Sequence, residues 1–128
     1  MMFGAGSDDR HIIEAIKRSQ GTIEFTMDGK IITANKNFLS LLGYELEEVK
    51  GKHHSMFVDP EYAKSPEYRE FWERLATGEF FTAEFHRFGK GGKDVWIQAT
   101  YCPVLNKHGK PYKVFKVASD VTDQKRQK

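Results

Sequence analysis

Apolar and polar residues alternate along parts of this chain with a period of two, which is typical of a strand with one buried face. Residues 22–27 show this alternation, and residues 30–34 form a second short run of the same kind. Asp28 and Gly29 lie between the two runs, and Asp-Gly is a favoured two-residue hairpin turn because it tolerates positive φ at both positions. The pattern therefore predicts a β-hairpin.

The period of two returns in the second half of the chain. It begins after Phe80, continues through the long run 94–104 and ends with the run 112–121. The connections 89–93 and 106–109 contain the glycine and asparagine residues that are typical of turns. Together with the hairpin, these three strands predict a five-stranded antiparallel sheet.

The residues between the hairpin and these strands carry helical signals. Asn35 can cap a short helix that ends at Gly43, and another short helix ends at Gly51. Ser65 offers a capping hydroxyl, and Pro66 takes the first helical position, where its missing N–H is not needed. Apolar residues then recur at i, i+3, i+4 and i+7 and form one wide face: Tyr68, Phe71, Trp72 and Leu75. We expect an α+β fold in which short helices cover one face of the sheet and enclose the space for any ligand.

The N-terminal residues predict one more helix. Ser7, Asp8 and Asp9 suit a helix start, because a side-chain acceptor and negative charge are favourable at that end. An apolar stripe follows before Gly21 and consists of Ile12, Ile13 and Ile16. This stripe can pack on the domain itself or against a second copy of the chain, and the sequence leaves both possibilities open.

The composition is that of one domain with a well-solvated surface. The chain has 128 residues, and its 20 basic and 18 acidic residues are spread along it with a formal net charge of +2. No clustered basic face predicts nucleic-acid binding. The single cysteine, Cys102, excludes an internal disulfide and a structural zinc site built from cysteines. Because no apolar run reaches the roughly 18 residues of a membrane span and the N-terminus lacks the order of a secretion signal, we expect a cytoplasmic segment.

Four stretches of the chain carry sequence motifs in a fixed order: DGKIITANKNFLSLLGYELEEVKGKHHSMF, FWERLATGE, GKDVWIQATYCPV and ASDVT. Together they resemble a PAS domain of the type found at the N-terminus of bacterial methyl-accepting chemotaxis receptors. The resemblance implies the PAS fold, with a cap helix in 1–21, a sensor domain in 22–122 and the start of a signalling helix or linker in 123–128. It also implies a sensory role, a homodimer and an output domain in the same receptor chain.

The resemblance also implies a connection to this output domain. An Asp-x-Thr at the end of the last strand joins such domains to the signalling helix, and Asp120 and Thr122 occupy these positions. Asp120 can bond backbone groups where the strand ends, and Thr122 can cap the next helix. An ordinary cap without a signalling role would use the same residue types, so both interpretations stay open.

The chain is similar to the flavin-binding PAS domain of aerotaxis receptors, which implies FAD as the cofactor. On this resemblance the contacts to FAD are Asn35, His54, Trp72 and Trp96. Such side chains supply the flat apolar faces and edge hydrogen bonds that an isoalloxazine ring needs. The chain departs from these receptors at Val58-Asp59, where they carry Arg-His, and at Phe81, where they carry Trp. Fewer cations are thus at hand for a pyrophosphate.

Haem b is the second possible cofactor, because some PAS oxygen sensors ligate iron through one histidine of the middle segment. His53 and His54 are the candidate ligands here, with Trp96 on the distal side. Adjacent histidines cannot both point into one pocket from a regular element, so one of them at most would bind iron. Rhizobial oxygen-sensing kinases use a helix position that is Glu73-Arg74 here, which disfavours that subtype.

A third interpretation requires no cofactor. Trp72 would be buried in any such domain, Asn35 is adequately explained as a helix cap, and Trp96 can simply pack against helices. The sequence shows no paired zinc-ligand spacing, P-loop order or nucleophile setting, so we do not expect an enzyme. We expect a sensory domain that reports redox state or oxygen through FAD or haem. The alternative is a cofactor-free PAS domain that serves dimerisation or protein interaction.

Overall fold

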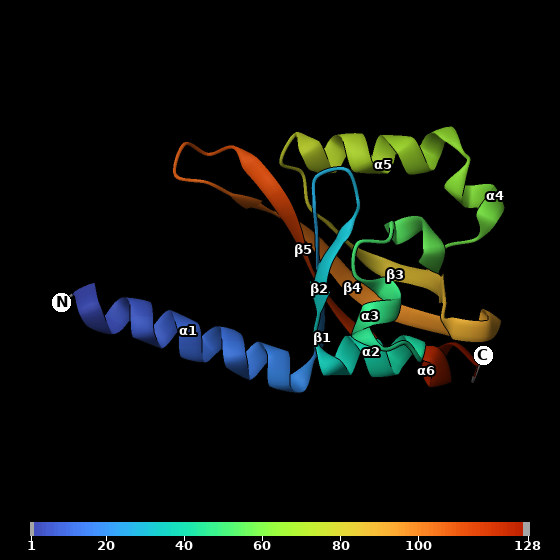
Figure 1. The fold of residues 1–128 in the computed structure, drawn as a ribbon, viewed down its shortest axis with the longest axis horizontal. Helices are drawn as coiled ribbons and strands as arrows, with labels where there is room; N and C mark the ends of the chain where they lie inside the picture. The colour runs from blue at the N-terminus through green and yellow to red at the C-terminus, as the bar shows by residue number, and fades with distance from the viewer. Residues whose placement is uncertain (1, 127–128) are drawn as a thin grey trace.

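The computed structural model describes the backbone of residues 2–126 and the side chains of residues 8–126. In this part of the chain, five strands form one antiparallel sheet in the spatial order β2-β1-β5-β4-β3 (Figure 1). The strands are β1 (Gly21–Phe25), β2 (Ile31–Ala34), β3 (Phe81–Phe88), β4 (Asp94–Leu105) and β5 (Pro111–Asp120). The predicted sheet is confirmed, with the last strand at its centre.

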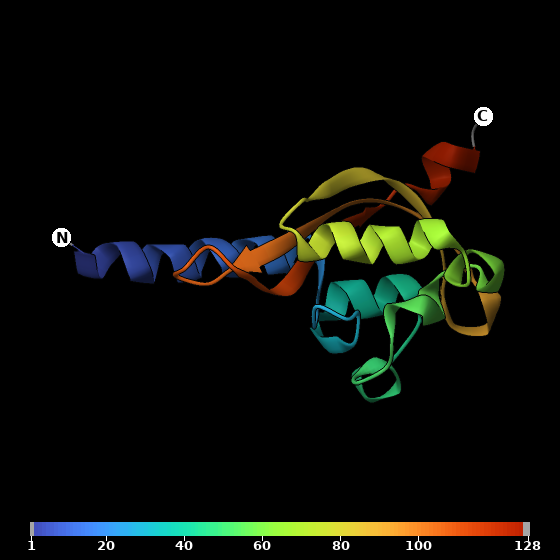
Figure 2. The same cartoon turned by 90° about the horizontal axis from the view of Figure 1, so that it is seen from above.

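Short helices cover one face of this sheet, as predicted (Figures 1 and 2). They are α2 (Lys36–Leu42), α3 (Leu46–Val49), the 3-10 helix η1 (His54–Phe57), α4 (Pro60–Ala63) and α5 (Pro66–Ala76), and a second 3-10 helix, η2 (Lys90–Gly92), joins β3 to β4. The side chain of Asn35 caps α2 by accepting the Phe38 N–H, and Ser65 caps α5 by accepting the Tyr68 N–H. Both caps are the predicted ones.

The terminal helices lie at opposite ends of the molecule (Figure 1). α1 (Met2–Ser19) projects beyond the sheet, and α6 (Thr122–Arg126) follows β5. α1 begins at Met2 and not at Ser7, so Asp8 and Asp9 lie inside the helix and not in its first turn. The preceding residues include no proline, so nothing forces the helix to start at Ser7. The Ser7 side chain, and residues 127–128 of the predicted exit segment, lie outside the described residues.

Strand alternation decides which side chains meet the helices. The helix-covered face of β4 and β5 carries residues that are at most 2% exposed: Val95, Ile97, Ala99, Tyr101, Val114, Lys116 and Ala118. The core continues into the helices through Phe38, Phe57, Trp72 and Leu75. Because successive residues of a strand point to opposite faces, Trp96 lies on the other side of the sheet.

The β1–β2 connection differs from the predicted two-residue turn. It spans residues 26–30, where the Thr26 N–H donates to the Lys30 carbonyl at 2.8 Å and the Gly29 N–H donates to the Thr26 carbonyl at 3.0 Å. Gly29 has a φ of 89°, and no non-glycine residue of the described chain has positive φ, so Asp28 does not. The Thr26 hydroxyl bonds both the Asp28 carboxylate and the Lys30 N–H, which closes a wider loop than Asp-Gly alone would form.

Candidate functional site

Six polar or aromatic side chains meet between α5 and the helix-covered face of the sheet. We call them the interior cluster: His54 of η1, Tyr68 and Trp72 of α5, Arg87 of β3, Tyr101 of β4 and Lys116 of β5. Helix periodicity brings Tyr68 and Trp72 to the same face of α5. Each of the three strand residues occupies an inward position of its strand, and Tyr101 is directly paired with Lys116 in the β4–β5 register.

A chain of hydrogen bonds runs through the interior cluster. Arg87 Nη2 donates to the Tyr101 hydroxyl at 2.9 Å, which lies 2.8 Å from His54 Nε2, and His54 Nδ1 lies 2.7 Å from the Tyr68 hydroxyl. Arginine can only donate, so the Tyr101 O–H can donate to Nε2 and leave Nδ1–H to donate to Tyr68. In this arrangement all four groups are paired, and the Tyr68 O–H stays free to donate to a ligand.

Burial fixes the charge of the central histidine. His54 is 0% exposed, and desolvation holds its pKa well below the ordinary value, with further lowering by the positive charge of Arg87. Burial also raises the pKa of both tyrosine hydroxyls, Tyr68 and Tyr101. The hydrogen-bonded chain is therefore neutral except at Arg87, the cation at one end of it.

Three buried donors of the cluster have no hydrogen-bond partner within the described part of the chain. They are Trp72 Nε1, Arg87 Nε and Lys116 Nζ. Lys116 Nζ lies 4.6 Å from the centroid of the Tyr101 ring and 5.1 Å from that of Phe38. Buried polar groups in proteins almost always have partners, and an exception calls for an explanation. All three atoms are donors, so a ligand that satisfies them must offer acceptors.

The interior cluster reaches the surface on two sides. Tyr68 and Trp72 border a cavity of about 410 Å³ together with Met27, His53 and Ala76. Arg87 borders a second cavity of about 300 Å³, whose lining includes Val58 and Phe85 and also the carboxylates of Asp59 and Glu84. The two cavities lie at opposite ends of the hydrogen-bonded chain, one at Tyr68 and the other at Arg87.

His53 does not join the interior cluster. Its Nε2–H donates to the Asp28 carbonyl at 2.9 Å, and its Nδ1 accepts the Ser55 N–H at 3.0 Å. A Cβ at Gly29 would lie 2.6 Å from His53 Nε2, so only glycine allows the ring to approach the β1–β2 connection so closely. The two adjacent histidines thus point in different directions. His53 binds the β1–β2 connection, whereas His54 lies in the interior.

Asn35 and Trp96 also lie apart from the interior cluster. The Asn35 carbonyl oxygen accepts the N–H groups of Thr22 and Phe38, and its amide donates to the carbonyls of Lys17 and Gln20. All these bonds are to backbone and tie α1, β1 and α2 together. Trp96 stacks on His86 on the opposite face of the sheet, with ring centroids 4.7 Å apart and planes at 5°. Of the four predicted flavin contacts, only His54 and Trp72 are brought together.

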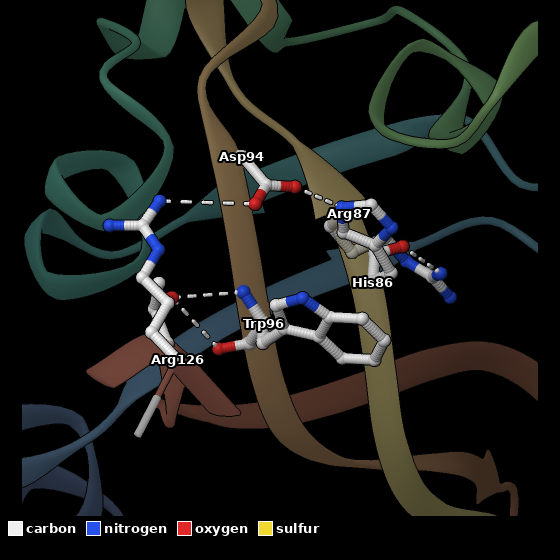
Figure 3. A network of polar contacts seen from close by, with 6 residues as sticks. His86, Arg87, Asp94, Trp96 and Arg126 are labelled. Carbon is white, nitrogen blue, oxygen red and sulfur yellow. Dashed lines mark hydrogen bonds and ion pairs between the residues drawn. The ribbon is translucent and has the colours of Figure 1, made fainter. Parts of the chain in front are cut away.

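The outer face of β4 holds the exit helix (Figure 3). Asp94 pairs with His86 and lies 3.8 Å from Arg126 of α6. The Trp96 N–H donates to the Thr122 hydroxyl at 2.9 Å, and that hydroxyl lies 3.4 Å from the Trp96 carbonyl. Thr122 therefore binds the backbone of β4 and does not cap α6 with its side chain as predicted. The capping bond comes from Asp120, whose carboxylate accepts the Thr122 N–H at 2.9 Å.

Arg87, Tyr101 and Lys116 were not among the predicted site residues. A signal for two of them exists in the sequence, because Arg87 and Lys116 interrupt strands at positions where the period of two requires an apolar residue. Tyr101 gives no such signal, since a tyrosine is unremarkable in a buried strand.

The fold and the order of its elements agree with the comparison to known families: residues 17–126 match the PAS fold family. The chain belongs to this family. The PAS domain is 43% identical over 114 residues to the biofilm dispersion protein BdlA of Pseudomonas aeruginosa, and the match covers 89% of this chain and 27% of that protein. It is 28% identical over 94 residues to the aerotaxis receptor of Escherichia coli, over 73% of this chain and 18% of the receptor. The chain spans about a quarter or less of the length of these curated relatives.

Among solved structures, the PAS domain of a protein from Colwellia psychrerythraea has a TM-score of 0.74 and 20% identity, over 89% of this chain and 97% of that one. At this identity the likeness shows the fold. The sequence relatives confirm the predicted resemblance to PAS domains of chemotaxis and aerotaxis receptors. Within residues 2–126, no helix of the PAS domain is both long and apolar enough to cross a bilayer.

Proposed function

We propose that this PAS domain senses redox state or oxygen through a flavin, FAD, held between α5 and the helix-covered face of the sheet. The observation that supports this proposal is the set of three buried donors without acceptors, Trp72 Nε1, Arg87 Nε and Lys116 Nζ. The pyrimidine edge of an isoalloxazine carries carbonyl oxygens and ring nitrogens that accept hydrogen bonds, and its flat body suits aromatic walls. When bound, the flavin would supply electron exchange with the surroundings.

Haem b is the second candidate, and the hydrogen bonds of the two histidines favour flavin over haem. An axial ligand needs a ring nitrogen with a free lone pair. Both nitrogens of His54 lie within hydrogen-bond distance of tyrosine hydroxyls, and both nitrogens of His53 are bonded to backbone groups. Either histidine would have to give up a bond to ligate iron, whereas the three unpaired donors have no hydrogen bond to give up to a flavin.

The signal would leave the interior cluster through β3 and β4. Arg87 Nη1 donates to the His86 carbonyl at 2.9 Å, and the His86 ring stacks on Trp96, whose backbone is bonded to Thr122. A change of contacts at Arg87 can therefore shift the balance between two positions of α6, from which an output domain in the same chain would be controlled. Asp120 and Thr122 are the coupling residues of this proposal.

The experiment that tests the flavin is an absorption spectrum of the purified domain after incubation with FAD. Bands of oxidised flavin that remain after gel filtration support the proposal, whereas an intense Soret band after incubation with haemin supports haem. Trp72→Phe should weaken FAD binding, and Trp96→Phe is the matched control because the same side chain lies on the opposite face. If Trp96→Phe weakens binding and Trp72→Phe does not, the interior is the wrong location. For haem, His53→Ala and His54→Ala made separately should abolish the Soret band in one case alone.

A cofactor-free dimerisation domain is the second candidate function. It is favoured by the uncovered apolar stripe of α1, where Ile12 and Ile13 are 51% and 47% exposed. Next to this stripe, Ile13 and Ile16 of α1 border a cavity of about 540 Å³ with Cys102 and Phe115 of the sheet. A second copy of the chain could cover this surface. A spectrum with protein absorbance alone after both reconstitutions, combined with a dimeric mass in solution, would favour this function over the flavin sensor.

A further inference from the structure

Two basic side chains, Arg87 and Lys116, are buried on the helix-covered face of the sheet, and neither forms an ion pair within residues 8–126. Arg87 is 5% exposed and Lys116 is 0% exposed. Within residues 8–126 the buried polar residues are Thr22, His54, Arg87 and Lys116, so no carboxylate is among them. An isolated buried charge is strongly disfavoured unless it is paired. This interior is therefore suited to receive negative charge.

The surroundings of Lys116 define where that charge would lie. The titratable groups that interact with Lys116 are Arg87 from β3, Tyr101 from β4 and His54 from η1. The other neighbours are Phe38 of α2 and Ile23 of β1, which do not titrate. Both basic heads approach Tyr101, Lys116 over the ring and Arg87 at the hydroxyl. Both basic groups therefore contact the same residue, Tyr101.

The two basic groups respond differently to this setting. A guanidinium keeps its proton in proteins, so Arg87 stays charged. Burial, followed by the positive charge of Arg87, holds the pKa of Lys116 well below its ordinary value. Without a ligand, this setting therefore shifts the amine toward its neutral form. A negative charge next to it would reverse this preference.

We propose that Lys116 and Arg87 form the anion-binding end of the interior site, and that Lys116 takes up one proton from solvent when a ligand places an anionic or acceptor-rich edge against it. The proton goes to the lone pair of Lys116 Nζ, and the positive charge that it creates is neutralised by an anionic ligand or stabilised by the hydrogen-bond acceptors of a neutral one. Binding is then coupled to pH. The inference rests on the proposed ligand-binding role of the interior cluster and adds the polarity and protonation of one end of it.

Two kinds of ligand can place an anionic or acceptor-rich edge against Lys116. One is the pyrimidine edge of the proposed flavin, and the other is the carboxylate of a small metabolite. Isothermal titration with FAD, repeated in buffers that differ in ionisation enthalpy, measures the protons taken up in the first case. Thermal unfolding with sodium acetate, sodium succinate or inorganic phosphate examines the second case.

Lys116→Met removes the amine and nearly keeps its shape. Because it also removes a buried ionisable group, we expect the ligand-free variant to melt at a higher temperature than the wild type, by roughly 3–10 °C. Lys113→Met is the matched control, since Lys113 lies on the same strand but on the partly exposed face, paired with Glu24 at 2.7 Å. Lys116→Gln is a second variant that keeps a polar tip and cannot take up a proton.

The outcomes separate this inference from the flavin proposal. One outcome supports both the flavin proposal and this inference. In it, the wild type binds FAD and takes up about one proton, and both Lys116 variants lose this uptake and bind FAD roughly tenfold or more weakly. Lys113→Met binds FAD and takes up the proton like the wild type. FAD binding without proton uptake and with unchanged affinity in Lys116→Met overturns the inference and leaves the flavin. Absence of FAD binding, with stabilisation by one of the anions in the wild type but not in the Lys116 variants, supports the inference and refutes the flavin. Absence of binding by FAD and by every anion overturns both.

Discussion

The hydrogen-bonded chain of the interior cluster can be tested by replacing Tyr101 with phenylalanine. The hydroxyl of Tyr101 is the central group of the chain, because it accepts from Arg87 Nη2 at 2.9 Å and lies 2.8 Å from His54 Nε2. Tyr101→Phe removes this oxygen and keeps the ring that packs against Phe71 and Phe85. The variant therefore isolates the polar contribution from the packing contribution.

The expected loss in the free energy of unfolding depends on which buried groups lose their hydrogen-bond partner with the hydroxyl. A buried group that loses its only partner costs about 1–3 kcal/mol, and more if it is charged. Tyr101→Phe strands one neutral nitrogen of His54 and one charged donor of Arg87, both inside the protein, so the free energy of unfolding should fall by about 3–5 kcal/mol. Tyr68→Phe strands only His54 Nδ1, and the corresponding loss should be about 1–2 kcal/mol.

The assay is urea unfolding at pH 7.5, followed by far-UV circular dichroism so that changes in the environment of Trp72 do not affect the signal. Tyr68→Phe is the matched control, because it makes the same chemical change at one end of the hydrogen-bonded chain. Two-state behaviour should be checked by comparing the slopes of the three transitions. If Tyr101→Phe lowers the free energy of unfolding no more than Tyr68→Phe does, the hydrogen bonds of the Tyr101 hydroxyl do not contribute the stability expected from their geometry.

Four further predictions concern other parts of the domain. Because burial lowers the pKa of His54, the unfolded state binds a proton that the folded state does not, so the free energy of unfolding should fall as the pH drops below about 6.5. His54→Phe should flatten this part of a plot of urea midpoint against pH. An unchanged plot would contradict the lowered pKa of His54. Thr122→Val removes the hydroxyl that binds the Trp96 backbone, and the Trp96 amide should exchange its hydrogen about five times faster, a change of about 1 kcal/mol; equal rates would show that α6 is held by other contacts. If the α1 stripe is a dimer contact, the double variant Ile12→Glu/Ile13→Glu should sediment as a monomer while the wild type sediments as a dimer; equal masses would exclude this contact. Asn35→Ala removes a cap and three further backbone bonds and should lower the free energy of unfolding by about 2 kcal/mol in urea titration, whereas a loss below about 0.5 kcal/mol would contradict its role.

Local chemistry made several features predictable from the residues alone. Ser65 and Pro66 define the start of α5 because a capping acceptor and a missing N–H both suit that position. The helical period then places Trp72 on the buried face, where it is 8% exposed. The predicted turn at Asp28-Gly29 was only partly correct, since the Thr26 hydroxyl enlarges the loop, and a side-chain bond of this kind is invisible to the hydrophobic pattern.

The composition of the candidate site was predictable only in part. Trp72 and His54 were expected in it, but the grouping of Trp96 with them ignored strand alternation, which places its neighbours Val95 and Ile97 inward and Trp96 outward. Asn35 was expected both as a cap and as a cofactor contact, and all its bonds in the structure are to backbone. Its role toward a cofactor, like that of His53, stays a prediction.

The sequence by itself determined most of the secondary structure and the sheet, because these depend on periodicity, caps and turns that act over a few residues, and four of its stretches carried the resemblance to PAS domains. The tertiary structure decided the interior cluster. His54 and Tyr101 are 47 positions apart, and Lys116 reaches Tyr101 only because β5 pairs with β4 at the centre of the sheet. Whether a buried lysine has an acid beside it depends on which distant segments pack around it, and no local pattern contains that information.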